Sequence, residues 1–263
     1  MKLDPFYQTQ LYGLDVFFNE IINLIDSNKL PNKILLTGSK GVGKSTLAIH
    51  LINYVLSKEE NFQYDLENFK INDNNKSHKL IQNRTSPNFY YVNIKTDKKN
   101  IDINQIRDLI KFCNKSSFNN KPRFILIDNI EFLNLNSSNA LLKILEEPNY
   151  NIYFILINNG KNILSTIKSR CLNFNIFLSF EESISVFNKI TGNDVFLNIN
   201  KDLINHYFTP GNLLNLYIFS KENNIDILDI NLNNFLLKLI DGKYYKKENS
   251  INDLIYELIQ MFY

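Results

Sequence analysis

One short stretch constrains the fold of this 263-residue chain more than any other: residues 38–46, with the sequence GSKGVGKST. The preceding residues 33–37, KILLT, fit a short buried strand, and residues 45–57 carry apolar side chains at helical spacing. A glycine-rich turn between a strand and a helix, closed by Gly-Lys-Ser, matches the phosphate-binding pattern GxxxxGK[ST]. A glycine-rich turn that matched this pattern by chance would not need a strand before it and a helix after it. We therefore expect an α/β protein that binds a nucleoside triphosphate, or that descends from one that did.

The residue types in this loop suit the chemistry of a bound triphosphate. Glycines let the backbone fold so that several N–H groups point at phosphate oxygens, and a lysine reaches the outer phosphates. The Ser45 hydroxyl is a candidate Mg²⁺ ligand. The candidate nucleotide-binding residues of the loop are Gly38, Gly41, Gly43, Lys44, Ser45 and Thr46.

Composition excludes several other classes of protein. The content is 44% hydrophobic and 21% charged with a formal net charge of +2, which is typical of a soluble globular protein and does not by itself indicate a nucleic-acid binder. Cys113 and Cys171 stand far apart, and the three histidines are scattered, so no disulfide framework or zinc site is expected. We find no signal-peptide pattern and no apolar run of membrane-spanning length, so we expect a cytoplasmic protein without membrane contact.

The order of apolar patterns predicts the domain plan. Strand-like and helix-like segments alternate to about residue 177, which is typical of a parallel sheet covered by helices. Residues 58–79 are polar and are expected to form a solvated loop or a weakly ordered insertion. Beyond residue 177 the pattern is helical. We predict a nucleotide-binding domain at 1–177, a helical lid at 178–225 and a short helical segment at 226–263.

A carboxylate supplies the second half of a phosphate site. Asp128 closes the apolar run FILI at 124–127 and is a candidate for orienting Mg²⁺, although an isolated Asp after a strand can also be a cap or turn residue. Hydrolysing P-loop proteins place a Glu next to this carboxylate to polarise the attacking water, and Asn129 stands there instead. An amide cannot accept the proton of a water, and Glu131 lies two residues too far along to replace it. We expect slow hydrolysis.

A second group of motifs carries a family resemblance. Residues 139–148, NALLKILEEP, and the tripeptide Ser169-Arg170-Cys171 resemble the signature of bacterial DNA polymerase III clamp-loader subunits, gamma/tau and delta-prime, of the AAA+ superfamily. The resemblance implies an AAA+ fold and a place in a five-subunit ring that uses ATP to close a sliding clamp around primed DNA. It also implies that Arg170 is an arginine finger for a neighbour's ATP site, where an isolated surface arginine is the other interpretation. Asn158 or Asn159 stands where the family places its first γ-phosphate sensor.

Departures from the family pattern narrow the role. The four-cysteine zinc module of many members is absent, and Asn212 replaces the arginine of the second sensor. A chain that keeps the phosphate loop and the finger, but lacks the base and the second sensor, resembles the delta-prime type. We therefore expect ATP or ADP with Mg²⁺ and no zinc, and as partners gamma/tau, delta, the sliding clamp and primed DNA through the assembled ring. Residues 226–263 are far shorter than the family's helical collar.

Two other functions remain open at this point. The first is an autonomous AAA+ ATPase or a gamma/tau-like motor subunit, which ATP hydrolysis by the purified chain would reveal. The second is a P-loop kinase for a small acceptor, which would leave the motifs at 139–148 and 169–171 unexplained. No carboxylate pair suited to two-metal polymerase chemistry stands out.

Overall fold

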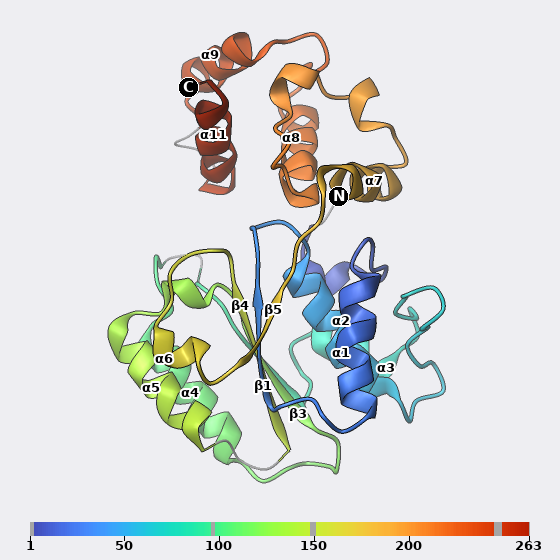
Figure 1. Ribbon diagram of the computed structural model, residues 1–263, viewed down its shortest axis with the longest axis vertical. Coiled ribbons are helices and arrows are strands. Elements are labelled where there is room, and N and C mark those ends of the chain that lie inside the picture. The colour runs from blue at the N-terminus through green and yellow to red at the C-terminus, as the bar shows by residue number, and fades with distance from the viewer. Residues whose placement is uncertain (1–2, 96–97, 148–150, 245–248, 263) are drawn as a thin grey trace. The chain divides into compact units, whose positions relative to one another are not determined.

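A parallel sheet of five strands, in the order β2-β3-β4-β1-β5, forms the centre of the first part of the chain (Figure 1). The computed structural model describes residues 3–95, 98–147, 151–244 and 249–262. Every strand pairing within the sheet is parallel, so the carboxyl ends of all five strands lie at one edge. The strands are β1 (Lys33–Thr37), β2 (Phe89–Val92), β3 (Arg123–Ile127), β4 (Ile152–Asn158) and β5 (Leu172–Asn175).

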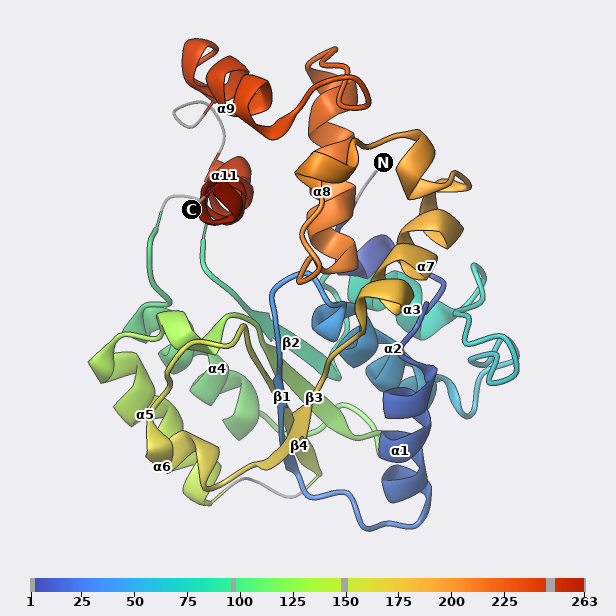
Figure 2. The same ribbon diagram turned by 45° about the horizontal axis from the view of Figure 1, so that its top comes forward.

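Helices cover both faces of this sheet. Figures 1 and 2 show α1 (Asp15–Asp26), α2 (Lys44–Ser57) and α3 (Lys76–Gln82) on one side. On the other side lie α4 (Ile103–Asn114), α5 (Leu135–Glu146) and α6 (Ser165–Lys168). The predicted α/β class, a parallel sheet flanked by helices and followed by a helical part, is confirmed.

The two faces explain why the strands read as continuous apolar runs. All five residues of β3 are buried, and along it successive side chains point to opposite faces of the sheet. Ile125 and Ile127 belong to a core cluster that also contains Leu109 of α4 and Leu141 of α5. Phe124 and Leu126 alternate with them and are buried toward the other layer of helices. A strand enclosed in this way needs apolar side chains on both faces.

A local capping signal sets the start of helix α4. Asp102 accepts hydrogen bonds from the backbone N–H groups of Asn104 and Gln105, and the Gln105 side chain accepts one from the Asp102 N–H. This reciprocal capping box satisfies donors that the first turn of a helix leaves unpaired. Helix α4 therefore begins at Ile103.

The described chain divides into two compact units. One contains Gly43–Phe177 and the N-terminal residues up to Ser39, and the other contains Leu178 onward together with residues 40–42. The second unit is helical, with α7 (Phe180–Thr191), α8 (Pro210–Glu222), α9 (Leu232–Asp241) and α11 (Asn249–Phe262). Phe187, Leu213, Phe235 and Leu258 are among its fully buried side chains, so this unit has an apolar core of its own.

Strand β5 is an element that the sequence analysis missed. Residues 172–176, LNFNI, alternate apolar residues with asparagine, a two-residue period that indicates a half-buried strand. Phe174 is buried, whereas Leu172 and Asn173 are exposed on β5, which is the outermost strand of the sheet. The exposed asparagines weakened the apolar signal, although the alternation itself was present.

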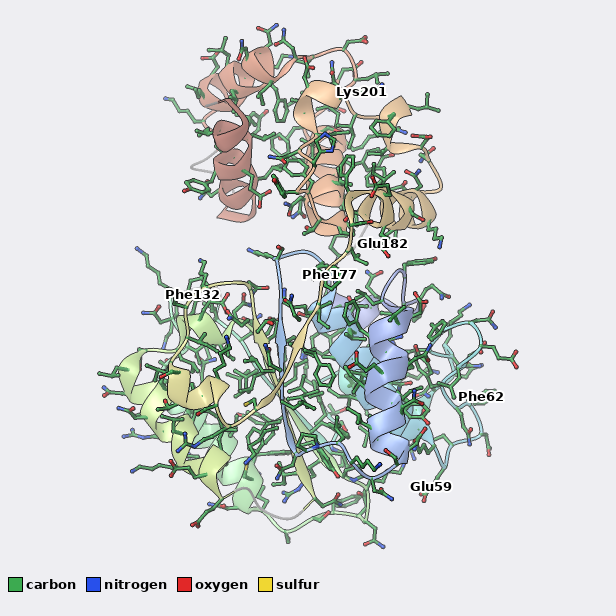
Figure 3. All side chains as sticks on the ribbon, in the orientation of Figure 1. Glu59, Phe62, Phe132, Phe177, Glu182 and Lys201 are labelled. Atoms are coloured by element: carbon green, nitrogen blue, oxygen red, sulfur yellow. The ribbon has the colours of Figure 1, made fainter. Side chains whose placement is uncertain are left out.

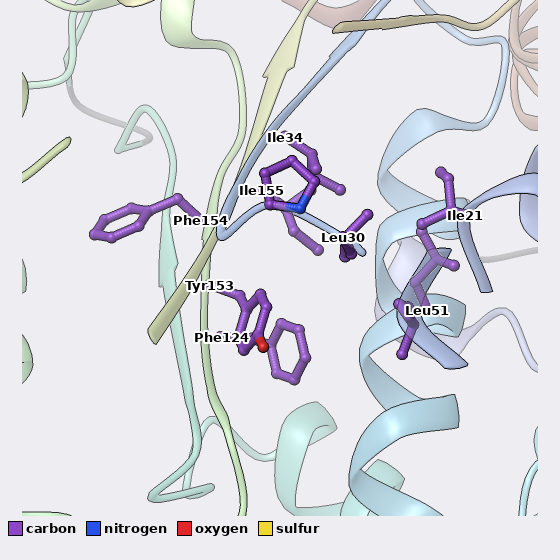
Figure 4. A pocket seen from close by; sticks show the side chains of 10 residues that line it. Ile21, Leu30, Ile34, Leu51, Phe124, Tyr153, Phe154 and Ile155 are labelled. Carbon is purple, nitrogen blue, oxygen red and sulfur yellow. The ribbon is translucent and has the colours of Figure 1, made fainter. Parts of the chain in front are cut away.

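A small apolar gap lies between α1 and the starting ends of β1, β3 and β4 (Figure 4). Its volume is about 10 Å³, and Ile21, Leu30, Phe124 and Tyr153 are among its lining residues. A space of that size holds at most about one water molecule. It is a gap in the packing of the core rather than a ligand site.

The expectation for residues 58–79 was partly wrong. The segment leads into α3, which begins at Lys76, and several of its side chains are buried, including those of Tyr64, Ile71 and Asn75. Asn75 Oδ1 accepts hydrogen bonds from Asn53 Nδ2 at 2.9 Å and from the His78 N–H at 2.8 Å. Asn75 Nδ2 donates to the carbonyl oxygen of Phe62, a residue labelled in Figure 3, at 2.8 Å. The polar composition therefore reflects buried hydrogen bonding as well as solvation.

Asn75→Ala should destabilise the protein by about 1–3 kcal/mol, because the change leaves the buried Asn53 amide and the His78 N–H without an acceptor. Asn74→Ala is the matched control, since Asn74 is an exposed neighbour in the same segment. Urea denaturation of both variants measures the difference. Equal stability of the two variants would show that Asn75 does not anchor residues 58–79.

Candidate functional site

The glycine-rich loop runs from the end of β1 to the start of α2, as the sequence predicted. Gly38 has φ +146°, and a Cβ there would lie 2.1 Å from the Ile176 carbonyl oxygen, so no other residue fits. Gly43 has φ +102° at the N-cap of α2, and a Cβ there would lie 3.0 Å from Leu14 Cδ1. Gly41 also has positive φ. The close approach of neighbouring backbone and side chains thus explains the glycines directly.

Lys44 is buried at the first position of α2. Its Nζ donates hydrogen bonds to the carbonyl oxygens of Gly38 at 2.8 Å and Ser39 at 2.7 Å, and only 3% of the residue is exposed. Burial lowers the pKa of Lys44 to about 8, against the opposing effects of the Asp128 and Glu131 carboxylates. A buried ammonium with a depressed pKa is stabilised by any anion that comes close to it. The loop therefore holds a cation that a phosphate group would complement.

Ser45 and Asp128 meet at the carboxyl edge of the sheet. Ser45 Oγ donates a hydrogen bond to Asp128 Oδ2 at 2.8 Å, and the Asp128 N–H is held by the Val92 carbonyl oxygen at 2.9 Å. Burial raises the pKa of Asp128, and the Ser45 hydrogen bond opposes that shift. A hydroxyl and a carboxylate oxygen are ligands that suit Mg²⁺. The predicted metal ligands, far apart in sequence, are in contact, whereas Thr46 is half-buried one residue further along α2.

An amide cluster that the sequence analysis did not predict lies beside Asp128. Asn129 Nδ2 donates to Asn93 Oδ1 at 2.8 Å, and Asn129 Oδ1 accepts from Asn159 Nδ2 at 2.8 Å. Asn159 Nδ2 also donates to Glu131 Oε1 at 3.0 Å. These four residues follow the carboxyl ends of β2, β3 and β4, and we call them the amide cluster. Alternating donors and acceptors tie three neighbouring loops together.

Asn129 suits its position in two further ways. Its φ is +60°, a left-handed conformation that asparagine adopts more readily than glutamate. Both polar atoms of its side chain are engaged within the amide cluster. A glutamate at 129 would therefore lose the donor to Asn93 and adopt an unfavourable backbone conformation. The site has no general base next to Asp128, and its neighbour is a structural amide.

The cluster extends back to the candidate metal ligand through an aromatic hydroxyl. Asn93 Nδ2 donates to the Tyr91 hydroxyl at 2.9 Å, and that hydroxyl lies 3.4 Å from Asp128 Oδ2. The Arg84 guanidinium lies over the Tyr91 ring, with its carbon 4.2 Å from the ring centroid. Tyr91 was not among the predicted site residues, since an aromatic residue in a strand is more often part of the core.

The two asparagines considered as γ-phosphate sensors have different surroundings. Asn158 ends β4 beside Thr37 of β1, its Nδ2 donates to the Lys161 carbonyl oxygen at 2.9 Å, and its buried Oδ1 has no hydrogen-bond partner within the described residues. Asn159 belongs to the amide cluster. Of the two, Asn158 therefore keeps an unused polar atom near the loop.

Arg170 does not lie at this edge. It lies between α6 and β5, two residues before β5 begins, whereas the loop and Asp128 follow β1 and β3. Arg170 therefore lies at the opposite edge of the parallel sheet, whose strands are seen in Figure 1. Its Nη1 donates to the Thr166 carbonyl oxygen at 2.8 Å, and its Nη2 pairs with Glu146 Oε1 at 2.7 Å. The structure thus keeps this guanidinium away from the chain's own Lys44.

Asn212 and the motif at 139–148 are the remaining predicted features. Asn212 lies in the first turn of α8, and its side-chain amide donates to Glu257 of α11. Pro148, the last residue of the predicted motif at 139–148, lies outside the described residues, and α5 ends at Glu146.

Within the described ranges no group of His, Cys, Asp and Glu side chains is arranged to hold a metal, and no helix is long and apolar enough to cross a membrane.

Comparison with known proteins assigns the family. Residues 14–178 match the family described as "DNA polymerase III, delta subunit", and this range is more than half of the chain. The chain belongs to this family. The matched range contains all five strands, both halves of the site and Arg170. Together with relatives named subunit delta', this match confirms the resemblance to the delta-prime type of subunit.

Relatives of this family member carry two kinds of name. DNA polymerase III subunit delta' of Buchnera aphidicola from Baizongia pistaciae is 29% identical over 57% of this chain and 45% of its own length. Subunit delta' of Pseudomonas aeruginosa is 31% identical over 52% and 40%. DNA polymerase III subunit gamma of Buchnera aphidicola from Schizaphis graminum is 31% identical over 68% and 47%. The chain spans less than half the length of these relatives.

Among solved structures, a gamma-subunit-related protein of DNA polymerase III from Thermotoga maritima is 20% identical. The alignment covers 66% of this chain and 52% of that protein, with a TM-score of 0.46.

The depressed pKa of Lys44 predicts a pH dependence of stability. Between about pH 8 and pH 10.5 the unfolded chain holds the Lys44 proton and the folded chain does not, so Lys44 makes the free energy of unfolding rise with pH. The difference in that free energy between wild type and Lys44→Met should grow by up to about 1.4 kcal/mol per pH unit. Denaturant titrations at pH 7.5, 8.5 and 9.5 measure it.

Burial raises the pKa of the Cys113 and Cys171 thiols, which makes the free energy of unfolding fall with pH over a similar range. Both proteins contain these thiols, so the difference between wild type and Lys44→Met isolates the contribution of Lys44. Lys79→Met, at an exposed position of α3, controls for the loss of a lysine. Parallel curves for wild type and Lys44→Met would contradict the buried, depressed state of Lys44.

Proposed function

We propose that this chain is a delta-prime-like subunit of the replicative sliding-clamp loader, which binds ATP or ADP with Mg²⁺ and supplies Arg170 in trans to a neighbouring ATPase subunit. The observation that carries the proposal is the meeting of Lys44, Ser45 and Asp128 at one edge of the sheet in a chain of this family. The arrangement offers a cation for phosphates and two oxygen ligands for a metal.

The nucleotide would be held by the loop and by the residues that follow β3 and β4. In this proposal Lys44 contacts the outer phosphates, and Ser45 and Asp128 hold Mg²⁺. Asn158 contributes its unused Oδ1 or, after rotation, its amide group. The proposed nucleotide-binding residues are Gly38, Gly41, Gly43, Lys44, Ser45, Thr46, Asp128 and Asn158.

The same site is poorly equipped for hydrolysis. A general base must lie within hydrogen-bond reach of the attacking water and accept its proton. Asn129 cannot accept a proton, and its side chain is engaged on both sides. The Glu131 carboxylate receives the Asn159 amide at Oε1 and the Asn159 N–H at Oε2. We infer weak or absent hydrolysis by this chain alone and no polymerase chemistry.

The position of Arg170 supports action on a neighbour. A guanidinium at the edge of the sheet opposite Lys44 cannot reach the nucleotide of its own chain without a large rearrangement, but its partly exposed side chain can meet another subunit. Arginine is the side chain of choice for stabilising charge that develops on a transferred phosphoryl group. The neighbour in this proposal is a gamma/tau subunit.

The assembled ring would supply the remaining partners, which are delta, the sliding clamp and primed DNA. We propose the domain plan of a nucleotide-binding domain at 1–177, a lid at 178–225 and a short collar-like segment at 226–263, in the cytoplasm. In the helical unit the Asn212 contact with Glu257 joins the lid to this last segment. That contact occupies the side chain that stands in the place of the second sensor.

One observation favours a second function. The gamma relative matches this chain at 31% identity over 68% of its length, so a gamma/tau-like motor or an autonomous ATPase is the alternative. It requires ATP turnover by the purified chain, which the amide cluster argues against.

Arg170→Ala should leave nucleotide binding by this chain unchanged and lower single-turnover hydrolysis at the neighbouring site by about a thousandfold or more, the effect of removing an arginine finger. The measurement is quenched-flow ATP hydrolysis by a ring reconstituted with the gamma/tau and delta subunits of the same source. Arg107→Ala is the control, since Arg107 is exposed on α4. An unaltered rate in the Arg170→Ala ring would remove the finger role.

A further inference from the structure

An ion pair joins the two sequence motifs by which the family is recognised. Glu146 is the last residue of α5, at the end of the motif 139–148, and its Oε1 lies 2.7 Å from Arg170 Nη2. The other terminal nitrogen of the guanidinium, Nη1, donates to the Thr166 carbonyl oxygen at 2.8 Å. Arg170 is thus bound in two directions by its own chain.

The backbone on both sides of this ion pair is firmly held. Leu141 and Leu145 of α5 and Ile167 of α6 are buried in the same core cluster. Lys33 Nζ donates to the Leu145 carbonyl oxygen at 2.9 Å, next to Glu146. The positions of the Glu146 and Arg170 backbones therefore follow from the core, and only the two side chains need to move to change the pairing.

The ion pair itself is accessible and easily exchanged. The side chains of Arg170 and Glu146 are 33% and 53% exposed. An ion pair in such a position contributes little to stability and is screened by salt. A phosphate group carries more negative charge than one carboxylate, and its oxygens can accept hydrogen bonds from both terminal nitrogens of a guanidinium, whereas Glu146 accepts from Nη2 alone. The Glu146 carboxylate is thus a weak competitor for the ligand that Arg170 would meet in trans.

We propose that Glu146 is a positioning residue that holds the Arg170 guanidinium against its own subunit until the phosphates of a neighbouring nucleotide displace the carboxylate. The inference rests on the proposed role of Arg170 as a finger and adds its regulation. While Glu146 holds Arg170 for part of the time, the guanidinium contacts the neighbour's nucleotide in only a fraction of the assembled rings. Removing the carboxylate charge increases that fraction.

The test is Glu146→Gln, which keeps the shape of the side chain and removes its charge, in the reconstituted ring. We expect kcat for ATP at the site facing this chain to rise about two- to fivefold, the range that release of an exposed ion pair allows. KM should be unchanged, because the finger acts on the transition state rather than on ATP binding. The rise should shrink as salt is increased, since screening already weakens the pair in the wild type.

Glu147→Gln is the matched control, because Glu147 is the adjacent acid at the end of α5 and is exposed. It should leave kcat at the wild-type value. The double variant Glu146→Gln with Arg170→Ala should match Arg170→Ala alone, since Glu146 acts only through the guanidinium. Thermal unfolding of each variant confirms that the fold is kept.

The outcomes separate the two claims. If Arg170→Ala lowers hydrolysis and Glu146→Gln leaves kcat unchanged or lowers it, the holding role of Glu146 is overturned while the finger remains. If Arg170→Ala has no effect, the proposed function itself fails. A change in KM with constant kcat for Glu146→Gln would also overturn the inference.

Discussion

The parallel pairing of β1 with β4 on one side and β5 on the other is the constraint on which the rest of the structure depends. It places the carboxyl ends of β1, β3 and β4 at one edge, where the loop, Asp128 and Asn158 follow them. It also brings Ile176, just after β5, against Gly38, where the Ile176 carbonyl oxygen leaves no room for a Cβ. Only a glycine can leave β1 in this geometry, so the sheet fixes how the glycine-rich loop begins.

The two edges of the sheet carry different chemistry. One edge has a buried lysine, a hydroxyl and a carboxylate, which suit a nucleotide and its metal, and beside them an amide cluster in which Asn129 is a connector rather than a base. The other edge has Arg170, paired with Glu146. In the proposed function the chain binds a nucleotide at the first edge and acts on a neighbour's nucleotide from the second. A subunit that binds nucleotide at one edge and places Arg170 at the other can affect hydrolysis only when a neighbouring subunit lies against that second edge.

Local sequence signals predicted most of the fold, and long-range contacts account for what they missed. The capping box at Asp102 and the glycine pattern at 38–43 depend only on residues that are close in sequence. The pairing of Ser45 with Asp128 followed from the known geometry of the motif. In contrast, the sequence around Asn75 is typical of a loop, because its hydrogen bonds with Asn53 and Phe62 form only when residues distant in sequence pack together. The same holds for the Asn129–Asn159 contact and for the Glu146–Arg170 pair, which join residues 24 or more positions apart. Abundant asparagines gave no indication of which ones would be buried and paired.

The central claim is that this site binds nucleotide without a base of its own. It is tested most directly by measuring binding and turnover together in the purified chain with Mg²⁺ and labelled ATP. The account predicts stoichiometric binding that is lost in Lys44→Ala, with bound ATP recovered intact over many minutes. Steady-state turnover at rates typical of an enzyme, about 1 s⁻¹ or faster, without any other subunit would contradict it.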